Sequence, residues 1–124
     1  MTYKFKKKFT SFENLFRNCY YITKINFKKV LGDNLIDISK MFYCCDGLTE
    51  VILKGLDTKN VKKAGQMFYG CSSLSNLDLN MLDFSKTEEM ISMFDGMENL
   101  VLIFLDNFNT QNVVTMSYMF NGNR

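Results

Sequence analysis

Four cysteines are the side chains of this 124-residue chain best suited to nucleophilic or metal chemistry. Three of them, Cys19, Cys45 and Cys71, are equally spaced along the chain, and Met97 occupies the next position of the same series. The methionine indicates a column of apolar filling, so these thiols are expected to be buried and slow to react. Stacked thiols could instead bind a soft metal or form a disulfide, but no second series of Cys or His supplies further ligands. We expect no metal site and no cofactor.

Cys44 stands outside that series. The positions equivalent to it hold Asn18, Gly70 and Gly96, and a glycine column favours a turn near the surface. Cys44 is therefore the candidate reactive thiol.

The absence of histidine excludes the most common catalytic base. Serine and cysteine nucleophiles normally depend on a histidine to remove their proton, and this chain has none. We therefore expect a protein that is not an enzyme.

The net charge of +2 is too small to predict a nucleic-acid partner. The basic residues are locally dense near the N-terminus, where a solvated arm is favoured over contact with phosphate or an anionic membrane. The lysines of this arm are Lys4, Lys6, Lys7 and Lys8, interleaved with Tyr3, Phe5 and Phe9.

No segment is apolar enough for membrane insertion. The longest apolar run extends from Leu100 to Leu105 and is far shorter than the roughly 18 residues that a span requires. The N-terminal lysines are not followed by the apolar region of a signal peptide. The sequence predicts no membrane span and no export signal.

A strict 26-residue period organises the chain. It relates the pairs Leu15-Phe16, Met41-Phe42, Met67-Phe68, Met93-Phe94 and Met119-Phe120 without insertion or deletion. We predict four repeats at 15–40, 41–66, 67–92 and 93–118, preceded by a basic arm and half-repeat cap at 1–14 and followed by a truncated fifth repeat at 119–124. Fixed periods of this length are typical of stacked repeat architectures.

Each repeat contains one pattern for a strand and one for a helix. Three apolar columns spell L-x-x-L-x-L, and the last two have the period of two of a half-buried strand. They are Ile22, Leu48, Leu74 and Leu100; Ile25, Val51, Leu77 and Ile103; and Phe27, Leu53, Leu79 and Leu105.

The second half of each repeat has helical spacing, as in Val61, Ala64, Met67 and Phe68. N-cap residue types precede it at 57–60 and 109–112. The predicted fold is an α/β repeat solenoid, a right-handed coil with a short parallel sheet on one face and short helical or 3-10 segments opposite.

One family resemblance follows from these repeats. The stretch Met67-Phe-Tyr-Gly-Cys-Ser-Ser-Leu-Ser-Asn-Leu-Asp-Leu-Asn80 resembles the BspA-like leucine-rich repeats of surface proteins from bacteria, mycoplasmas and anaerobic protists. The resemblance covers residues 9–124, with departures at Cys44, Phe84 and Thr87. It implies a parallel-strand solenoid at the cell surface or secreted, adhesion to host or bacterial ligands for some members, and no catalytic residues.

The outward positions of the predicted strands form the candidate partner-binding surface. Such positions vary between repeats while the scaffold stays constant, although ordinary solvated side chains would look the same. Leu102 and Phe104 differ, because exposed large apolar side chains favour a covering partner. The candidate residues are Lys24, Asn26, Lys28, Glu50, Ile52, Lys54, Asn76, Asp78, Asn80, Leu102, Phe104 and Asp106.

The favoured function is a non-catalytic protein-binding module, adhesin-like or a scaffold. The alternative is a structural spacer within a longer repeat array. Expected partners are another protein or further repeats of the same kind, including self-association through an uncovered C-terminal end.

Overall fold

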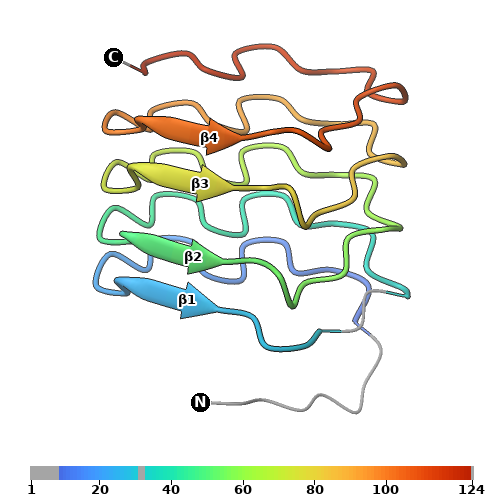
Figure 1. Ribbon diagram of the computed structural model, residues 1–124, viewed down its shortest axis with the longest axis horizontal. Helices are drawn as coiled ribbons and strands as arrows, with labels where there is room; N and C mark the ends of the chain where they lie inside the picture. The colour runs from blue at the N-terminus through green and yellow to red at the C-terminus, as the bar shows by residue number, and fades with distance from the viewer. Residues whose placement is uncertain (1–8, 31–32, 124) are drawn as a thin grey trace.

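The structure, a computed structural model, describes residues 9–30 and 33–123. Its four strands are short and parallel, and each comes from a different repeat unit (Figure 1). They are β1 (Lys24–Asn26), β2 (Glu50–Ile52), β3 (Asn76–Asp78) and β4 (Leu102–Phe104). β1 pairs with β2, and β3 pairs with β4, with Lys24 opposite Glu50 and Asn76 opposite Leu102. The predicted strands are therefore present, and residues one period apart lie side by side.

The four strands form two sheets rather than the continuous sheet face that we expected. β2 and β3 are neighbours, but no backbone hydrogen bond joins them among the described residues. A Cβ added at Gly47 or Gly55, on either side of β2, would overlap a backbone carbonyl oxygen of the first unit. Because these two glycines carry no side chain, β2 can lie close to β1.

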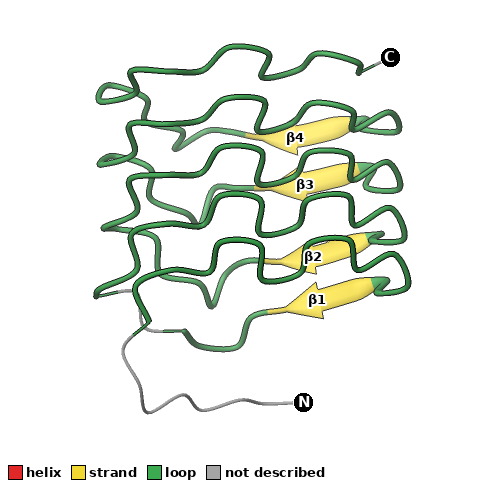
Figure 2. Ribbon diagram, turned by 180° about the vertical axis from the view of Figure 1, so that it is seen from behind, coloured by secondary structure: helices red, strands yellow, loops and turns green. Residues whose placement is uncertain are grey.

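Between strands the chain returns along the opposite side of the molecule, where a second set of backbone contacts joins the units (Figure 2). We call this the turn side. The N–H of Phe42, for example, donates to the carbonyl of Met67, 2.9 Å away in the next unit. Parallel bridges there join one column of residues: Ser11, Asp37, Lys63, Glu89 and Thr115.

The segments predicted to be helical or 3-10 are successions of turns, and the described part of the chain contains no helix. The N–H of Met41 closes a turn with the carbonyl of Ile38 at 3.3 Å. Lys40 and Cys44 have φ values of 55° and 53°, which a right-handed helix does not allow. Positive φ recurs at the equivalent positions of the other units, namely Asn14, Gln66, Ser92 and Tyr118, and Asn18, Gly70, Gly96 and Gly122.

The predicted helix N-caps are Asx turns. Oδ1 of Asp57 accepts the N–H of Lys59 at 3.1 Å, and Oδ1 of Asn109 accepts the N–H of Gln111 at 3.0 Å. A side chain that bonds to the backbone two residues later turns the chain without starting a helix. The sequence signal for a turn was correct, and its interpretation as a helix start was wrong.

The core lies between the strands and the turn side and is layered by column. Its central feature is a stack of phenylalanine rings at 16, 42, 68, 94 and 120, whose successive centroids are 5.7, 5.1, 6.2 and 5.2 Å apart. Within this stack Phe42, Phe68 and Phe94 are fully buried. Phe120, in the last described layer, is 47% exposed.

The predicted basic arm falls largely outside the described residues, because its lysines lie within residues 1–8. Within the described part, no helix is long and apolar enough to cross a membrane.

Candidate functional site

The twelve predicted partner-binding residues form three columns on the outer side of the strands, and we call these columns the strand face. Within each strand the middle residue points inward and the flanking two are exposed, as the period of two requires. The first column contains the first residue of each strand, the second contains the last residue of each strand, and the third contains the residue two positions after the strand end. They are Lys24, Glu50, Asn76 and Leu102; Asn26, Ile52, Asp78 and Phe104; and Lys28, Lys54, Asn80 and Asp106.

One ion pair within the strand face joins β1 to β2. Lys24 Nζ lies 3.1 Å from Glu50 Oε2, with both side chains largely exposed. A pair in this position adds little to stability, so both side chains can exchange this contact for one with a partner.

Asn80 is less available than we predicted. Its side-chain amide donates to Asp106 Oδ2 at 2.8 Å, and its Oδ1 accepts the Asp106 N–H at 2.8 Å. Both polar atoms of the amide therefore join neighbouring units, and the residue is half-buried. Asn80 positions the backbone at this edge of the strand face.

Three apolar side chains of the strand face are exposed to solvent. Ile52, Leu102 and Phe104 are 40%, 46% and 41% exposed. Ile52 lies between Asn26 and Asp78 of its column, away from either end of the described stack. The expectation that Leu102 and Phe104 point away from the core is confirmed.

Cys44 is half-buried and lies in the turn that its sequence position predicted, with a φ of 53°. Burial is the main cause that raises the pKa of its thiol, and the Asp46 carboxylate raises that pKa further while Arg17 opposes the change. A raised pKa lowers the fraction of thiolate, the reactive form. The structure gives Cys44 partial access to solvent but no activation.

Of the three thiols predicted to be buried, Cys45 and Cys71 are buried and Cys19 is not. Cys45 and Cys71 have no exposed surface, and their Sγ atoms donate to the carbonyls of Phe16 and Phe42 at 3.0 and 3.1 Å. Burial raises the pKa of Cys45 to about 11 and raises that of Cys71 further. Cys19, in the first layer, is half-buried, and all three are free thiols.

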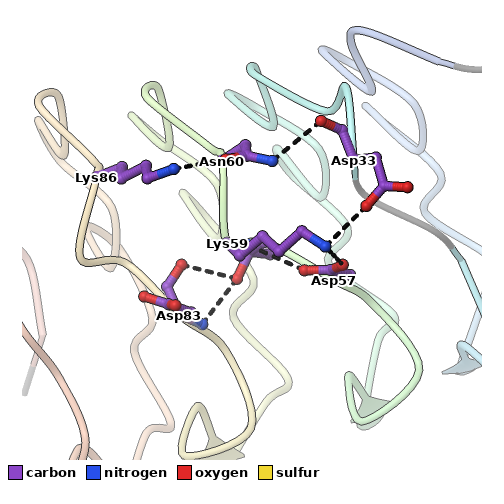
Figure 3. A network of polar contacts seen from close by, with 7 residues as sticks. Asp33, Asp57, Lys59, Asn60, Asp83 and Lys86 are labelled. Atoms are coloured by element: carbon purple, nitrogen blue, oxygen red, sulfur yellow. Dashed lines mark hydrogen bonds and ion pairs between the residues drawn. The ribbon is translucent and has the colours of Figure 1, made fainter.

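A polar network that joins neighbouring units was not predicted (Figure 3). Lys59 Nζ lies 2.7 Å from Asp33 Oδ1 and 3.3 Å from Asp57 Oδ2. Thr58 Oγ1, although buried, donates to the Asp83 carbonyl at 2.9 Å and accepts the Asp83 N–H at 2.8 Å. Asp33 and Lys59 are one period apart, so a search for opposite charges within one column could have found this pair. The contact of Thr58 with Asp83 instead joins neighbouring columns of successive units.

A shallow hollow lies on the turn side. It lies at Gly65, which has no side chain and occupies the same column as Ser39 and Ile91. Asp37, Lys63 and Glu89 line it. The charges alternate in sign, which favours contacts between units over one kind of ligand. Within the described part of the chain, no group of three metal-ligating side chains is assembled.

Comparison with known proteins gives one match to a family. A family model described as "Mycoplasma protein of unknown function, DUF285" matches residues 10–124, which include all four strands. No curated protein and no solved structure matches the chain.

Proposed function

The chain belongs to the Mycoplasma family of unknown function DUF285, and from this premise we propose that it is a non-catalytic protein-binding module. The strand face is its contact surface. This family is found in BspA-like proteins, and we propose that the four units are leucine-rich repeats of that kind, coiled as a solenoid. An adhesin-like or scaffold role follows from such a surface.

The observation that carries the proposal is the contrast between two adjacent strand columns. The inward column holds only aliphatic residues, Ile25, Val51, Leu77 and Ile103. The next column, one residue later on the exposed side, holds an amide, an aliphatic, a carboxylate and an aromatic side chain: Asn26, Ile52, Asp78 and Phe104. Because each pair of strands keeps the same register, the outer column can change without disturbing the core.

The exposed apolar residues make this surface suited to a protein partner. Interfaces obtain most of their binding energy from a few apolar or aromatic anchors within a polar surround. Ile52 is 40% exposed, and its column neighbours Asn26 and Asp78 supply polar groups. Lys28 and Lys54 are exposed beside it and have no ion pair among the described residues.

The test uses peptides as the probe. A library of random 15-residue peptides is selected on the immobilised chain, and one selected peptide is synthesised with a fluorophore for anisotropy titration. We expect Ile52→Asn to weaken its binding at least tenfold, which corresponds to about 1.4 kcal/mol. Asn26 already occupies this column in the first unit, so the variant should fold.

Ile91→Ser is the matched control. Ile91 is 36% exposed on the turn side, and Ser39 and Ser117 occupy its column in other units. The control should bind the peptide as the wild type does. Equal binding by both variants, or a library without any selectable peptide, would favour a structural spacer over a binding module.

A further inference from the structure

The strand face carries opposite net charge on its two sheets. Its residues on and after β1 and β2 include three lysines and one glutamate, a net charge of +2, whereas those on and after β3 and β4 include two aspartates, a net charge of −2. The four strands lie in chain order along the molecule (Figure 1). The two charges therefore occupy opposite halves of one surface.

Two lysines of the basic half lie side by side without an anion between them. Lys28 and Lys54 are one period apart, and the parallel pairing of Val30 with Leu56 keeps the same register beyond them. Both side chains are exposed, and neither ammonium group has an ion pair with a described residue. Like charges at facing positions of neighbouring strands repel each other, so an anionic group of a partner would relieve this repulsion.

The two aspartates of the acidic half are held in position by Asn80. Oδ1 of Asp78 accepts the Asn80 N–H at 2.9 Å, and Oδ2 of Asp106 accepts the side-chain amide of Asn80 at 2.8 Å. Both aspartates are exposed, and neither has an ion pair within the described part of the chain. Each carboxylate can accept further hydrogen bonds, so a cationic side chain of a partner would meet two positioned carboxylates.

Apolar surface lies between the lysine pair and Asp106. Ile52 and Phe104 are 40% and 41% exposed and flank Asp78 in their column. An apolar side chain that lies between these two residues would lose contact with water, as the anchor of an interface does. Along the stack of units the surface thus presents cations first, then apolar groups, then anions.

We propose that the strand face binds an extended peptide segment in which an acidic and a basic residue are four positions apart, with an apolar residue midway. The inference rests on the proposed function and names the partner of the same surface. The midpoint of the lysine pair lies two and a half strand spacings from Asp106, about 12 Å at 4.8 Å per spacing, and four residues of extended chain cover about 13 Å. Alternate residues of such a chain point to the same side, so its acidic, apolar and basic side chains all face the strands.

Selection of random 15-residue peptides on the immobilised chain tests this inference separately from the proposed function. The selected pool should contain the acid, apolar and base spacing several times more often than the unselected library. A pool whose binding depends on Ile52 but lacks this enrichment would overturn the inference and leave the binding module in place. A library without any selectable peptide would overturn both.

A double-mutant cycle with one enriched peptide locates the charges. Lys54→Asn and Asp106→Asn should each weaken binding about threefold, as expected for loss of one exposed ion pair. Both variants should fold, because Asn80 occupies the same column. Lys54→Asn should have no effect on a peptide whose acidic residue is replaced by glutamine, and Asp106→Asn should have none on a peptide whose basic residue is replaced.

Lys63→Asn is the matched control for charge. It removes one exposed lysine from the turn side, so it changes the net charge as Lys54→Asn does and should bind the peptide as the wild type does. Equal weakening by Lys63→Asn and Lys54→Asn would show that only the overall charge matters. Unchanged binding by Lys54→Asn and Asp106→Asn would show that the charged residues of the peptide lie elsewhere, and either result would overturn the proposal.

Discussion

The rings of Phe42 and Phe68 lie nearly parallel, with centroids 5.1 Å apart and an interplanar angle of 14°, although they belong to consecutive repeats of the sequence. The same relationship joins Phe68 to Phe94 and Phe94 to Phe120. Each interior ring is thus covered by the units before and after its own. The energetic role of a residue therefore depends on its layer as well as its column.

Removing an interior ring should be far more costly than removing the last one. Phe68→Ala should lower the free energy of unfolding by about 3 to 5 kcal/mol, from lost burial and the cavity left behind. Phe120→Ala should cost much less, because its side chain is already 47% exposed. Urea denaturation of both variants measures the difference, and equal losses would contradict the layered core.

Alanine substitution should be more costly at a glycine with positive φ, Gly96, than at one without it, Gly65. Gly96 has a φ of 72°, and the nearest atoms to an added Cβ are 3.5 Å away, so Gly96→Ala should cost about 1 to 2 kcal/mol from backbone conformation alone. At Gly65 the closest atom is Glu89 Oε1 at 3.0 Å, the end of a flexible side chain, and φ is not positive. Thermal unfolding should show Gly65→Ala to be the milder change, and the reverse order would show that space rather than φ decides.

Two buried threonines should respond differently to loss of the hydroxyl. Thr58→Val leaves the Asp83 N–H without its acceptor and should cost about 1 to 3 kcal/mol. Thr87 Oγ1 only donates to the Val61 carbonyl at 2.9 Å, and valine occupies its column at 61 and 113. Thr87→Val should therefore be nearly neutral in chemical denaturation. A larger loss of unfolding free energy for Thr87→Val than for Thr58→Val would show that the hydrogen bonds of Thr58 with Asp83 do not stabilise the contact between these units.

Thiol accessibility should follow the same layers. Under native conditions Cys44 should react with iodoacetamide well before Cys71, because Cys44 is half-buried whereas Cys71 has no exposed surface and burial raises its pKa. Cys44 should nevertheless react more slowly than a free cysteine, since its own pKa is raised. Peptide mass mapping after timed quenching ranks the sites. Early modification of Cys71 would contradict the column assignment.

The strands and the core columns could be predicted from the sequence because both follow directly from apolar spacing. Ile25 and Val51 carry the period of two, and the structure places them in one inward column. The strict repeat then fixes which residues stack, since any other register would misalign every phenylalanine.

The helices were mispredicted because spacing alone does not report φ. The residues Ile38, Met41 and Phe42 have helical spacing, but Lys40 between them adopts a φ of 55°, and their N–H groups bond to the next unit or close single turns. A lysine does not indicate a positive φ, so the position of Lys40 could not be recognised from the sequence. The glycines at 70, 96 and 122 did indicate turns. The availability of Asn80 was likewise overestimated, because alternation along a strand does not show which residues of one outward column bond to each other, as Asn80 and Asp106 do.

The last prediction concerns the dependence of stability on pH above neutrality. Burial raises the pKa of the Cys45 thiol to about 11 from an ordinary value of 9.0, so the folded chain holds this proton more tightly than the unfolded chain does. The stabilisation is therefore complete below pH 9 and is lost as the pH rises from 9 through about 11. Tyrosine and lysine residues titrate in the same range, so the comparison must be made with Cys45→Ser. That variant can still donate to the Phe16 carbonyl, as the thiol does at 3.0 Å, but it does not titrate. We expect the free energy of unfolding, measured in urea at pH 8, 9, 10 and 11, to fall more steeply for the wild type than for Cys45→Ser. Parallel curves would show that the Cys45 proton is held no more tightly in the folded chain than in the unfolded one.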